Sequence, residues 1–596
     1  MTSGRLSGCD PAHAGVNEPS AEPLVVRVLP DEPAIDREFD YEIPARLVLD
    51  SPVPIEVGTI VRMDLGPRRL RGWVTAVGVE PPEGIALSAV TKITGAGPPA
   101  HIMELADWAS HRWLGPRPRF LRTASPQKVA ITARPMDRSP TMLGSLDPLA
   151  AAAFERRAAV VRRGPGHDDW PLVVEAARQG RALVLVPTID VARRMLLRLR
   201  RAGVEAALFP GDWGHARTAQ VVVGPRSAAW APIADLDAVL VLDEHDEAYQ
   251  EEAAPTWNGR DVALERARRD GAAWVVASPA PSLEVLTCGA PLLTTSRAVE
   301  RASWPVLDIA DRRGEDPTTG EWCSVELSAA LRSRRRVVCV LNRKGRARLA
   351  YCHACGELAR SETDGGALGL DGTNLVTADG AVDRPAVCAQ CGSSRFRRVK
   401  LGVTGVAEEL ALVARRPVAE VSAASGPVAD AELYVGTEAV LHRVERADVV
   451  AFLDIDQELL APRYRAEEEV VALLIKAARL LGPRTEGGRL LVQTRMPDHP
   501  VLEAVLQADP GRLARPALAA RRLLGQPPVS SWITVSGPAA GAFMERLGSP
   551  MGLDITGAAD GQWRVRSEDR DLLLDTLGRV ARPPGRLRIA VDPMRV

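Results

Sequence analysis

Short apolar runs separated by Pro, Gly and Asp begin soon after residue 22. Runs of this length between turn residues are typical of strands in a small β-rich domain. We expect that domain to cover residues 23–98, with strands that start near Val25, Phe39, Ile60 and Trp73.

Helical periodicity replaces the short runs further along the chain. Apolar residues recur at helical spacing between Ile102 and Trp113, which predicts a helical, winged-helix-like module and a linker within residues 99–150. At the other end, residues 1–22 are rich in Ser, Gly, Pro and Ala and predict a flexible tail.

From about residue 150, buried apolar runs alternate with helical segments. Near-continuous Val and Leu runs separated by helices predict parallel sheets covered on both faces. The expected strands lie at 182–186, 220–224, 238–242 and 273–277 in a first set, and at 337–341, 418–421, 433–436, 449–453 and 489–493 in a second.

The fold class we expect is multidomain α/β. The first lobe would cover residues 151–310, and the second would be split into residues 311–350 and 400–500. The segment that splits it, residues 351–399, contains cysteines and little apolar periodicity. A small α+β domain over residues 501–596 would end the chain.

The composition is that of a soluble globular protein, with 46% apolar and 25% charged residues among 596. The net charge of -1 excludes a general polycation but leaves room for local basic grooves. No apolar run approaches the ~18 residues that span a bilayer, and the polar N-terminus lacks the apolar core of a signal peptide. We therefore expect a cytoplasmic protein without membrane partners.

Lysine is scarce, and this bears on nucleotide binding. Only five of the 75 basic residues are Lys, and none of the five follows a Gly. A phosphate loop of the form GxxxxGK[ST] needs that Gly-Lys pair. The chain therefore contains no standard phosphate loop.

Two Cys-x-x-Cys pairs, Cys352/Cys355 and Cys388/Cys391, are the strongest chemical signal in the sequence. Two such turns facing one another supply four thiolates for a tetrahedral Zn²⁺, and four thiolates leave no open position for water. We predict one structural zinc site, with a redox dithiol and a chance spacing as the alternatives.

Several segments together resemble the primosomal protein N′ (PriA) family of replication-restart helicases. The resemblance follows the domain order over nearly the whole chain. The segments that carry it are Ala34–Tyr41, Asp64–Val74, Val223–Ala228, Leu242–Tyr249, Gly259–Ala263, Ser278–Glu284, Leu341–Arg346, Val492–Pro500 and Ile589–Pro593. It implies two RecA-like helicase lobes, a zinc-binding insertion, an N-terminal domain that binds the 3′ end of DNA, and a small C-terminal domain.

The ATPase motifs of that family are degenerate here. Residues 163–170 stand where the family has its phosphate loop, and they hold no Lys and no hydroxyl for Mg²⁺. Without a gap, the Mg²⁺-binding Asp becomes Leu242, although a one-residue gap would restore Asp243 and Glu244 to the acidic roles. Arg479 is retained, but the candidate arginine finger is Gly482. We interpret Asp243, Glu244, His245 and Arg479 as vestigial and expect no productive binding of ATP and Mg²⁺.

The resemblance also bears on the metal. The family has four cysteine pairs in two interleaved zinc sites, and its outer pairs share one metal. Cys352/Cys355 and Cys388/Cys391 match the outer pairs, whereas residues 361–384 contain neither Cys nor His. We therefore expect one zinc site to be retained and the other to be lost.

The residues that we expect to bind DNA lie in two segments of the β-rich domain. Arg68 and Arg69 would contact phosphates, although Arg residues exposed in a hairpin are common. The candidates for recognition of a 3′ end are Asp36 and Asp40 as hydrogen-bond acceptors and Phe39 and Tyr41 as stacking residues. Core packing is the alternative for both aromatic residues, and the basic stretch of residues 117–122 is an alternative DNA site.

The function we predict is recognition of stalled or branched DNA forks and reloading of the replication machinery, without helicase activity. By resemblance, the partners would be forked DNA, 3′ ends and other primosome and fork proteins, such as single-stranded-DNA-binding protein and the helicase loader, and the protein would associate with the nucleoid. An active ATP-dependent 3′–5′ helicase with a non-standard nucleotide site is the first alternative, and a pure interaction scaffold is the second.

Overall fold

The computed structural model describes residues 23–594 apart from residues 81–83, 85, 131–142, 145–146, 316–321, 334, 342–349, 364, 378–380, 399–402, 423–427, 429 and 558–560. The predicted tail and most of the predicted segment Leu341–Arg346 lie outside the described residues. The chain divides into two compact units. The first consists of Met1–Ser110 and Pro116–Arg134, and the second of His111–Gly115 and Pro135–Val596.

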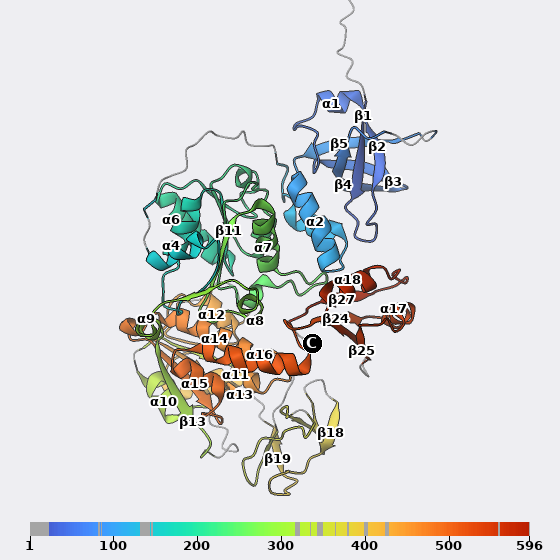
Figure 1. Ribbon diagram of the computed structural model, residues 1–596. Coiled ribbons are helices and arrows are strands. Elements are labelled where there is room, and N and C mark those ends of the chain that lie inside the picture. The colour runs from blue at the N-terminus through green and yellow to red at the C-terminus, as the bar shows by residue number, and fades with distance from the viewer. Residues whose placement is uncertain are drawn as a thin grey trace, which may run out of the picture. The chain divides into compact units, whose positions relative to one another are not determined.

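The first unit is built on a closed five-stranded barrel. Its strands are β1 (Leu24–Pro30), β2 (Phe39–Ile43), β3 (Ile60–Leu65), β4 (Arg68–Val77) and β5 (Ser88–Gly95), arranged in the order β1-β2-β5-β3-β4, and a short helix, α1 (Ala45–Leu49), follows β2 (Figure 1). Alternate side chains point inward and fill the barrel, as the period of two requires. Val26, Val28 and Trp73 are fully buried there.

Two helices belong largely to the same unit. They are α2 (Ala100–Arg112) and α3 (Arg117–Ala124). The indole N–H of Trp73 donates to the Ser125 hydroxyl at 2.9 Å, which ties the end of α3 to the barrel core. The barrel and these helices therefore form one unit, whereas we expected separate segments over residues 23–98 and 99–150.

The first lobe of the second unit contains a parallel sheet. Its order is β12-β6-β11-β10-β7-β9-β8. The strands are β6 (Ala158–Arg162), β7 (Ala182–Leu185), β8 (Ala206–Leu208), β9 (Val221–Gly224), β10 (Ala238–Leu242), β11 (Ala273–Ser278) and β12 (Leu292–Thr294). The helices of this lobe are α4 (Pro148–Glu155), α5 (Trp170–Gln179), α6 (Ile189–Arg201), α7 (Gly259–Asp270), α8 (Leu283–Leu286) and α9 (Arg297–Ser303).

The second lobe contains another parallel sheet, in the order β13-β23-β22-β14-β21-β20. Its strands are β13 (Val306–Asp311), β14 (Val337–Val340), β20 (Ala419–Val421), β21 (Leu433–Gly436), β22 (Val449–Phe452) and β23 (Arg489–Thr494). Its helices are α10 (Val325–Arg332), α11 (Val403–Ala414), α12 (Ala439–Arg443), α13 (Asp456–Leu459), α14 (Ala466–Leu481) and α15 (Pro500–Leu506). Strand β13, which we had assigned to the first lobe, begins this sheet because it pairs with β23.

The two sheets have the same topology. Six strands of each lobe can be numbered 1 to 6 in chain order, starting from β6 in the first lobe and from β13 in the second. Their order across the sheet is then 1-6-5-2-4-3 in both lobes. All of these pairs are parallel. In open sheets of this kind, ligands bind beyond the carboxyl ends of the strands. The repeated order confirms the predicted pair of related α/β lobes.

The insertion and the C-terminal domain complete the second unit. The insertion has a two-stranded ladder of β15 (Ala350–Cys352) and β19 (Phe396–Arg398), and a three-stranded sheet of β16 (Gly369–Asp371), β17 (Asn374–Val376) and β18 (Val382–Pro385). After helix α16 (Ala514–Leu524), an antiparallel sheet has the order β25-β26-β24-β27. Its strands are β24 (Ser531–Ser536), β25 (Asp554–Gly557), β26 (Trp563–Ser567) and β27 (Arg588–Val591), and its helices are α17 (Ala540–Leu547) and α18 (Arg570–Gly578).

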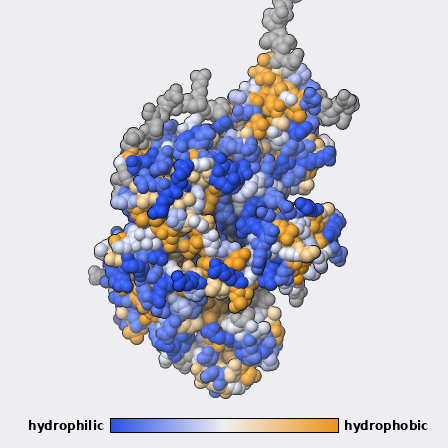
Figure 2. All heavy atoms as spheres, in the orientation of Figure 1, coloured by the Kyte–Doolittle hydropathy of each residue, from blue (hydrophilic) through white to orange (hydrophobic). Residues whose placement is uncertain are grey.

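The surface is that of a protein with internal cores. Hydrophilic residues cover much of the face seen in Figure 2, and the hydrophobic residues on it are gathered in separate patches. Among the described residues, no helix combines the length and the apolar character that a membrane span needs.

Candidate functional site

The four cysteines of the insertion come together as predicted. The sulfurs of Cys352 and Cys391 are 3.5 Å apart, those of Cys355 and Cys388 are 3.6 Å apart, and all four lie within 4.8 Å of one another. Sulfurs placed tetrahedrally at about 2.3 Å from a zinc ion would be roughly 3.8 Å apart. The cluster therefore has the size and the donor set of a site for one metal ion.

Backbone N–H groups surround the sulfurs. The Ala354 N–H points at the sulfur of Cys352, at 3.4 Å. Burial opposes ionisation of the Cys352 thiol, but hydrogen bonds from the N–H groups of Cys355 and Ala354, together with those of the Cys391 and Cys355 side chains, outweigh it and lower its pKa to about 6. A thiolate stabilised in this way is ready to bind a cation.

The middle of the insertion is held by apolar packing instead of further cysteines. Ala350, Ala359, Leu368, Leu375 and Ala386 form a small buried cluster. Beside it, the buried Ser361 hydroxyl donates to the carboxylate of Asp383 at 2.8 Å. A hydrophobic core of this kind gives the segment a reason to fold without a second metal.

The loop between β6 and α5 takes the place of a phosphate loop. Gly166, His167 and Asp168 stand where such a loop has Gly, Lys and Ser or Thr. Burial and the nearby charge of Arg163 lower the pKa of His167, so its imidazole is neutral at pH 7 and supplies no cation for phosphate. The Arg163 guanidinium is buried and donates to Asp147 at 3.0 Å, at the start of helix α4.

Protein atoms fill the space next to this loop. The Gly166 N–H donates to the carbonyl of Ser303 at 2.9 Å, and the His167 N–H donates to Gly164 at 3.2 Å. A Cβ on Gly164 would lie 1.8 Å from the Ser303 hydroxyl, and one on Gly166 would lie 2.9 Å from the nitrogen of Pro483. The loop therefore packs tightly against Ser303 at the end of α9 and against Pro483 after α14, and two of its amides are already used.

An ion triple occupies the carboxyl ends of β6 and β10. The Arg479 guanidinium on α14 contacts Asp169 at 3.2 Å and Asp243 at 2.5 Å, and it also donates to the carbonyl of Pro165. Burial raises the pKa of both carboxyls, and the charge of Arg479 opposes that rise. Of the predicted vestigial residues, the structure thus brings Asp243 and Arg479 together, and it adds Asp169.

Glu244 and His245 have structural contacts within the first lobe. The buried Glu244 carboxylate accepts from Arg260 at 3.0 Å and from the backbone N–H of Ser282 at 2.6 Å. His245 shares a hydrogen bond with the Ser278 hydroxyl at 2.8 Å, and burial lowers its pKa to about 4. A carboxylate held by a guanidinium and an amide is a poor general base.

The position of the expected arginine finger ends a helix. Gly482 follows α14 with φ of 73°, in the left-handed region that favours glycine. A Cβ there would lie 2.4 Å from the carboxylate of Glu486. The local backbone therefore suits Gly and disfavours Arg.

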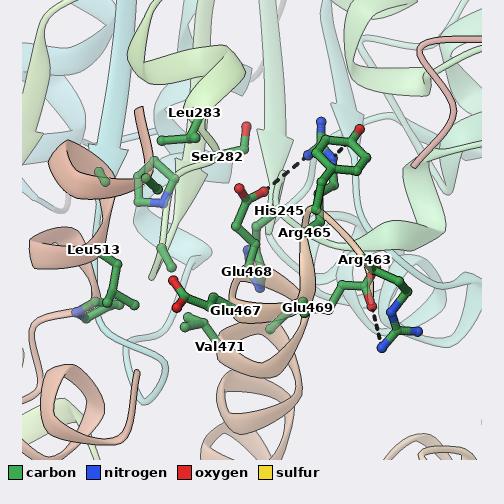
Figure 3. A pocket seen from close by; sticks show the side chains of 18 of the residues that line it. His245, Ser282, Leu283, Arg463, Arg465, Glu467, Glu468, Glu469, Val471 and Leu513 are labelled. Atoms are coloured by element: carbon green, nitrogen blue, oxygen red, sulfur yellow. Dashed lines mark hydrogen bonds and ion pairs between the residues drawn. The ribbon is translucent and has the colours of Figure 1, made fainter. Parts of the chain in front are cut away.

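A cavity of about 690 Å³ lies beside the ion triple, between the lobes and α16. Figure 3 shows that its cations point at acidic neighbours: Arg465 pairs with Glu468 at 3.3 Å, and Arg463 pairs with Glu469 at 3.0 Å. Neither Asp169 nor Asp243 lines it. The cavity is thus separate from the position of the degenerate phosphate loop.

In the barrel, the two acidic candidates are already paired. The Arg117 guanidinium donates to Asp36 at 2.9 Å and to Glu38 at 2.7 Å, and Arg27 donates to Asp40 at 2.8 Å. Arg117, which we had weighed as an alternative phosphate contact, instead joins α3 to the segment before β2. A DNA end would have to share or displace these pairs.

The two aromatic candidates differ in exposure. Tyr41 is 3% exposed, and its hydroxyl donates to the carbonyl of Asp64 at 3.1 Å, because its side chain points into the barrel. That ring belongs to the core and is not available for stacking, contrary to our expectation. Phe39 is half-buried, and the guanidinium of Arg37 lies 5.1 Å from its ring centre.

The basic candidates project from a hairpin. Gly66 and Pro67 form the two-residue turn between β3 and β4, and φ of 58° at Gly66 suits the glycine of a type II′ turn. The side chains of Arg68 and Arg69 are 61% and 63% exposed. Each has one acidic neighbour, Glu32 for Arg68 at 2.8 Å and Asp64 for Arg69 at 3.2 Å. Exposed pairs of this kind are weak enough for phosphate to compete.

Known proteins provide an independent comparison. Residues 27–126 match the PriA family model described as the 3'DNA-binding domain (3'BD). The probable replication restart protein PriA of Mycobacterium leprae is 28% identical over 599 residues, 90% of this chain and 91% of that protein. The replication restart protein PriA of Haemophilus influenzae is 25% identical over 396 residues, 60% of this chain and 54% of that protein.

Among solved structures, the DExH-box NTPase HrpB of E. coli aligns with 59% of this chain and 42% of its own length, at 13% identity and a TM-score of 0.32. That score is too low to assign the fold by itself. The assignment rests instead on the domain match, the relatives that span most of the chain, the repeated strand order and the cysteine cluster. The domain match and the relatives along most of the chain together support the resemblance to the PriA family of replication restart proteins.

Proposed function

We propose that this protein recognises branched DNA and free 3′ ends through its barrel and promotes reloading of the replication machinery. The observation that carries the proposal is the match of residues 27–126 to a 3′ DNA-binding domain. Arg68 and Arg69 would contact phosphates because they project from the hairpin, and Phe39 would stack on the terminal base. Asp36 and Asp40 would accept hydrogen bonds from the DNA end after Arg117 and Arg27 shift towards phosphate.

The protein does this, in our proposal, without hydrolysing ATP. The cradle lysine is replaced by a neutral His167, and the candidate finger by Gly482. Arg479, which would otherwise be free to contact phosphate, is bound by two carboxylates. Loss of an arginine finger alone costs about 10³-fold or more in rate, so loss of finger and cradle together leaves no effective ATPase.

The cysteine cluster holds one structural zinc ion in this proposal. Cys352, Cys355, Cys388 and Cys391 would supply four thiolates, and the ion would fix the ends of the insertion against one another. The insertion and the C-terminal domain would then serve as docking surfaces for primosome and fork proteins, among them single-stranded-DNA-binding protein and the helicase loader.

One experiment tests the proposal: titration of a fluorescent fork with a recessed 3′ end, paired with an ATP hydrolysis assay on the same preparation. We expect tight fork binding without nucleotide and no hydrolysis stimulated by DNA. Hydrolysis at ordinary helicase rates that is lost in Asp243→Asn would establish the active helicase instead. Absence of fork binding in a folded, metal-loaded protein would favour the pure scaffold.

A further inference from the structure

One face of helix α14 and the residue before it carry three cations towards the first lobe. Arg465, Lys476 and Arg479 are 11 and 3 residues apart, which is three turns and then nearly one more turn of an α-helix. The other faces of α14 are buried in the core of the second lobe, through residues such as Val470, Leu474 and Leu481. The cations are therefore held on a fixed surface.

Each cation contacts an acidic group that follows a strand of the first lobe. Arg479 meets Asp169 and Asp243, Lys476 lies 3.5 Å from Asp246, and Arg465 pairs with Glu284. These acids come after β6, β10 and β11, so they lie at the carboxyl ends of the strands, where open parallel sheets bind ligands. The contacts span the same edge of the sheet that a nucleotide would need.

Two of the cations also contact acidic groups outside the first lobe, on the side of α14. Lys476 donates to Glu438 at 2.7 Å, and Glu468 contacts both Arg465 and Arg521. The side chains of Lys476 and Arg465 are 11% and 12% exposed. Separating the lobes would leave Asp169, Asp243 and Glu284 without their cations in partly buried positions, which is costly in a low-dielectric surrounding.

We infer that the contacts of these three cations form a clamp that holds the two lobes permanently closed, with carboxylates of the protein in the place of nucleotide phosphates. The inference rests on the proposed function, since it explains how a relative of helicase motors can act on DNA with two lobes that do not move. It goes further, because it assigns Arg465, Lys476, Asp169, Asp246 and Glu284 a role that does not depend on ATP.

Fixed lobes have a mechanical consequence. In a nucleotide-driven motor, binding and release of ATP alternate between closed and open arrangements of two lobes, which requires that the closed state depend on the ligand. A ligand shifts such an equilibrium only through a difference in its affinity for the two states. Here the carboxylates that would compete with phosphate belong to the same chain as the cations, so their contacts form without a free ligand.

Hydrogen exchange on the full-length protein tests the clamp. In the wild type we expect the amides of residues 163–173 and 476–488 to exchange at the same rates with and without 5 mM Mg-ATP, a concentration above the usual range of enzyme KM values, about 1 μM to 1 mM. In Arg479→Ala we expect exchange in both segments to be at least tenfold faster, because the lobes part more often. The matched control is Arg463→Ala, which removes a half-buried Arg whose partners, Glu458 and Glu469, lie in its own lobe.

Three results would overturn the inference. These are slower exchange of the wild-type segments on adding Mg-ATP, unchanged exchange in Arg479→Ala, or the same acceleration in Arg463→Ala. If Arg479→Ala does not fold, Lys476→Met and Glu284→Gln remove the flanking contacts singly and should accelerate the same segments by a smaller factor. Fork titration of each preparation distinguishes failure of the clamp from failure of the proposed function. A protein that binds forks but whose hydrogen exchange changes on adding nucleotide contradicts the clamp and leaves the proposed function intact.

Discussion

Arg479 and Asp169 are 310 positions apart in the chain, yet their side chains meet at 3.2 Å beyond the carboxyl end of β6. Asp243 lies on the other side of the same guanidinium. Two carboxylates and one cation leave one surplus negative charge in a buried place. The balance of charges in this triple gives sharp expectations for substitutions.

Removing the cation should destabilise the protein far more than removing one carboxylate. Arg479→Ala leaves Asp169 and Asp243 unpaired, and we expect it to lower the free energy of unfolding by about 3–5 kcal/mol. Asp169→Asn should change it by less than about 1 kcal/mol, because Arg479 stays paired with Asp243 and the Asp169 side chain caps no helix amide. Urea denaturation of both variants measures the difference, and equal effects would contradict the charge count.

The same triple predicts how the stability of Arg479→Ala depends on pH. Burial already raises the pKa of Asp169 and Asp243, and loss of Arg479 removes the charge that opposes the rise. The folded variant then takes up protons at a higher pH than the unfolded chain, whose carboxyls titrate near 3.9. Its stability deficit relative to the wild type should therefore shrink as the pH falls from about 7 towards 5. A deficit that grows on acidification would show that the carboxyls are not buried as anions.

The glycine after α14 should resist conversion into an arginine finger. Gly482→Arg places a side chain on a backbone of positive φ and against Glu486, so we expect a loss of about 1–3 kcal/mol in the free energy of unfolding. It should not create ATP hydrolysis, since the cradle lysine is still missing. Gly487→Arg is the matched control, with similar φ of 75° but open space around the Cβ. Hydrolysis gained by Gly482→Arg alone would show that the rest of the site is intact.

The cysteine cluster predicts one zinc ion per chain. Elemental analysis of purified protein should give a ratio near one, and Cys352→Ser combined with Cys388→Ser should abolish it, because each substitution removes one ligand from a different Cys-x-x-Cys pair. Cys339→Ser is the control, since that thiol is buried in β14, within the core of the second lobe, and is not part of the cluster. A ratio near two would reveal a second metal among residues that we assign to an apolar core.

Much of the fold was predictable because most strands are continuous Val and Leu runs, such as 182–185 and 238–242. Strand β6 was missed because Arg residues flank its short run, and β13 because Asp308 interrupts its apolar pattern at the edge of the sheet. The strands of the insertion have only three or four residues each, too few for a periodic signal.

Part of the candidate site was predictable from the sequence, and part was not. The cysteine cluster was predictable because its spacing alone defines the geometry. Asp169 was not, because its partner is remote in sequence; the only local signal was the acidic pair Asp168-Asp169 in the segment that stands where the family has its phosphate loop. Tyr41 was misjudged because the alternation along β2 leaves open which face is buried until the barrel is closed.

The aromatic residues of β2 should now separate in a binding assay. Phe39→Ala should weaken binding of a free 3′ end by about 1–3 kcal/mol through loss of stacking. Tyr41→Phe should leave DNA affinity unchanged and lower stability by about 1 kcal/mol, since it removes only the hydrogen bond to Asp64. Competition with a 3′-phosphorylated oligonucleotide reports end recognition. The reverse pattern would place the stacking ring inside the barrel and refute the assignment.

The most direct test of nucleotide-independent fork binding through the hairpin is the salt dependence of affinity. Wild-type protein titrated onto a fork without ATP should show log K falling with log[salt] at a slope of roughly -1.5 to -3. Arg68→Ala with Arg69→Ala should weaken binding and flatten that slope by about one to two units. Arg193→Ala with Arg268→Ala, which removes two exposed, acid-paired arginines of the first lobe, should leave both unchanged. An unaltered slope in the hairpin variant, or a requirement for ATP, would contradict the account.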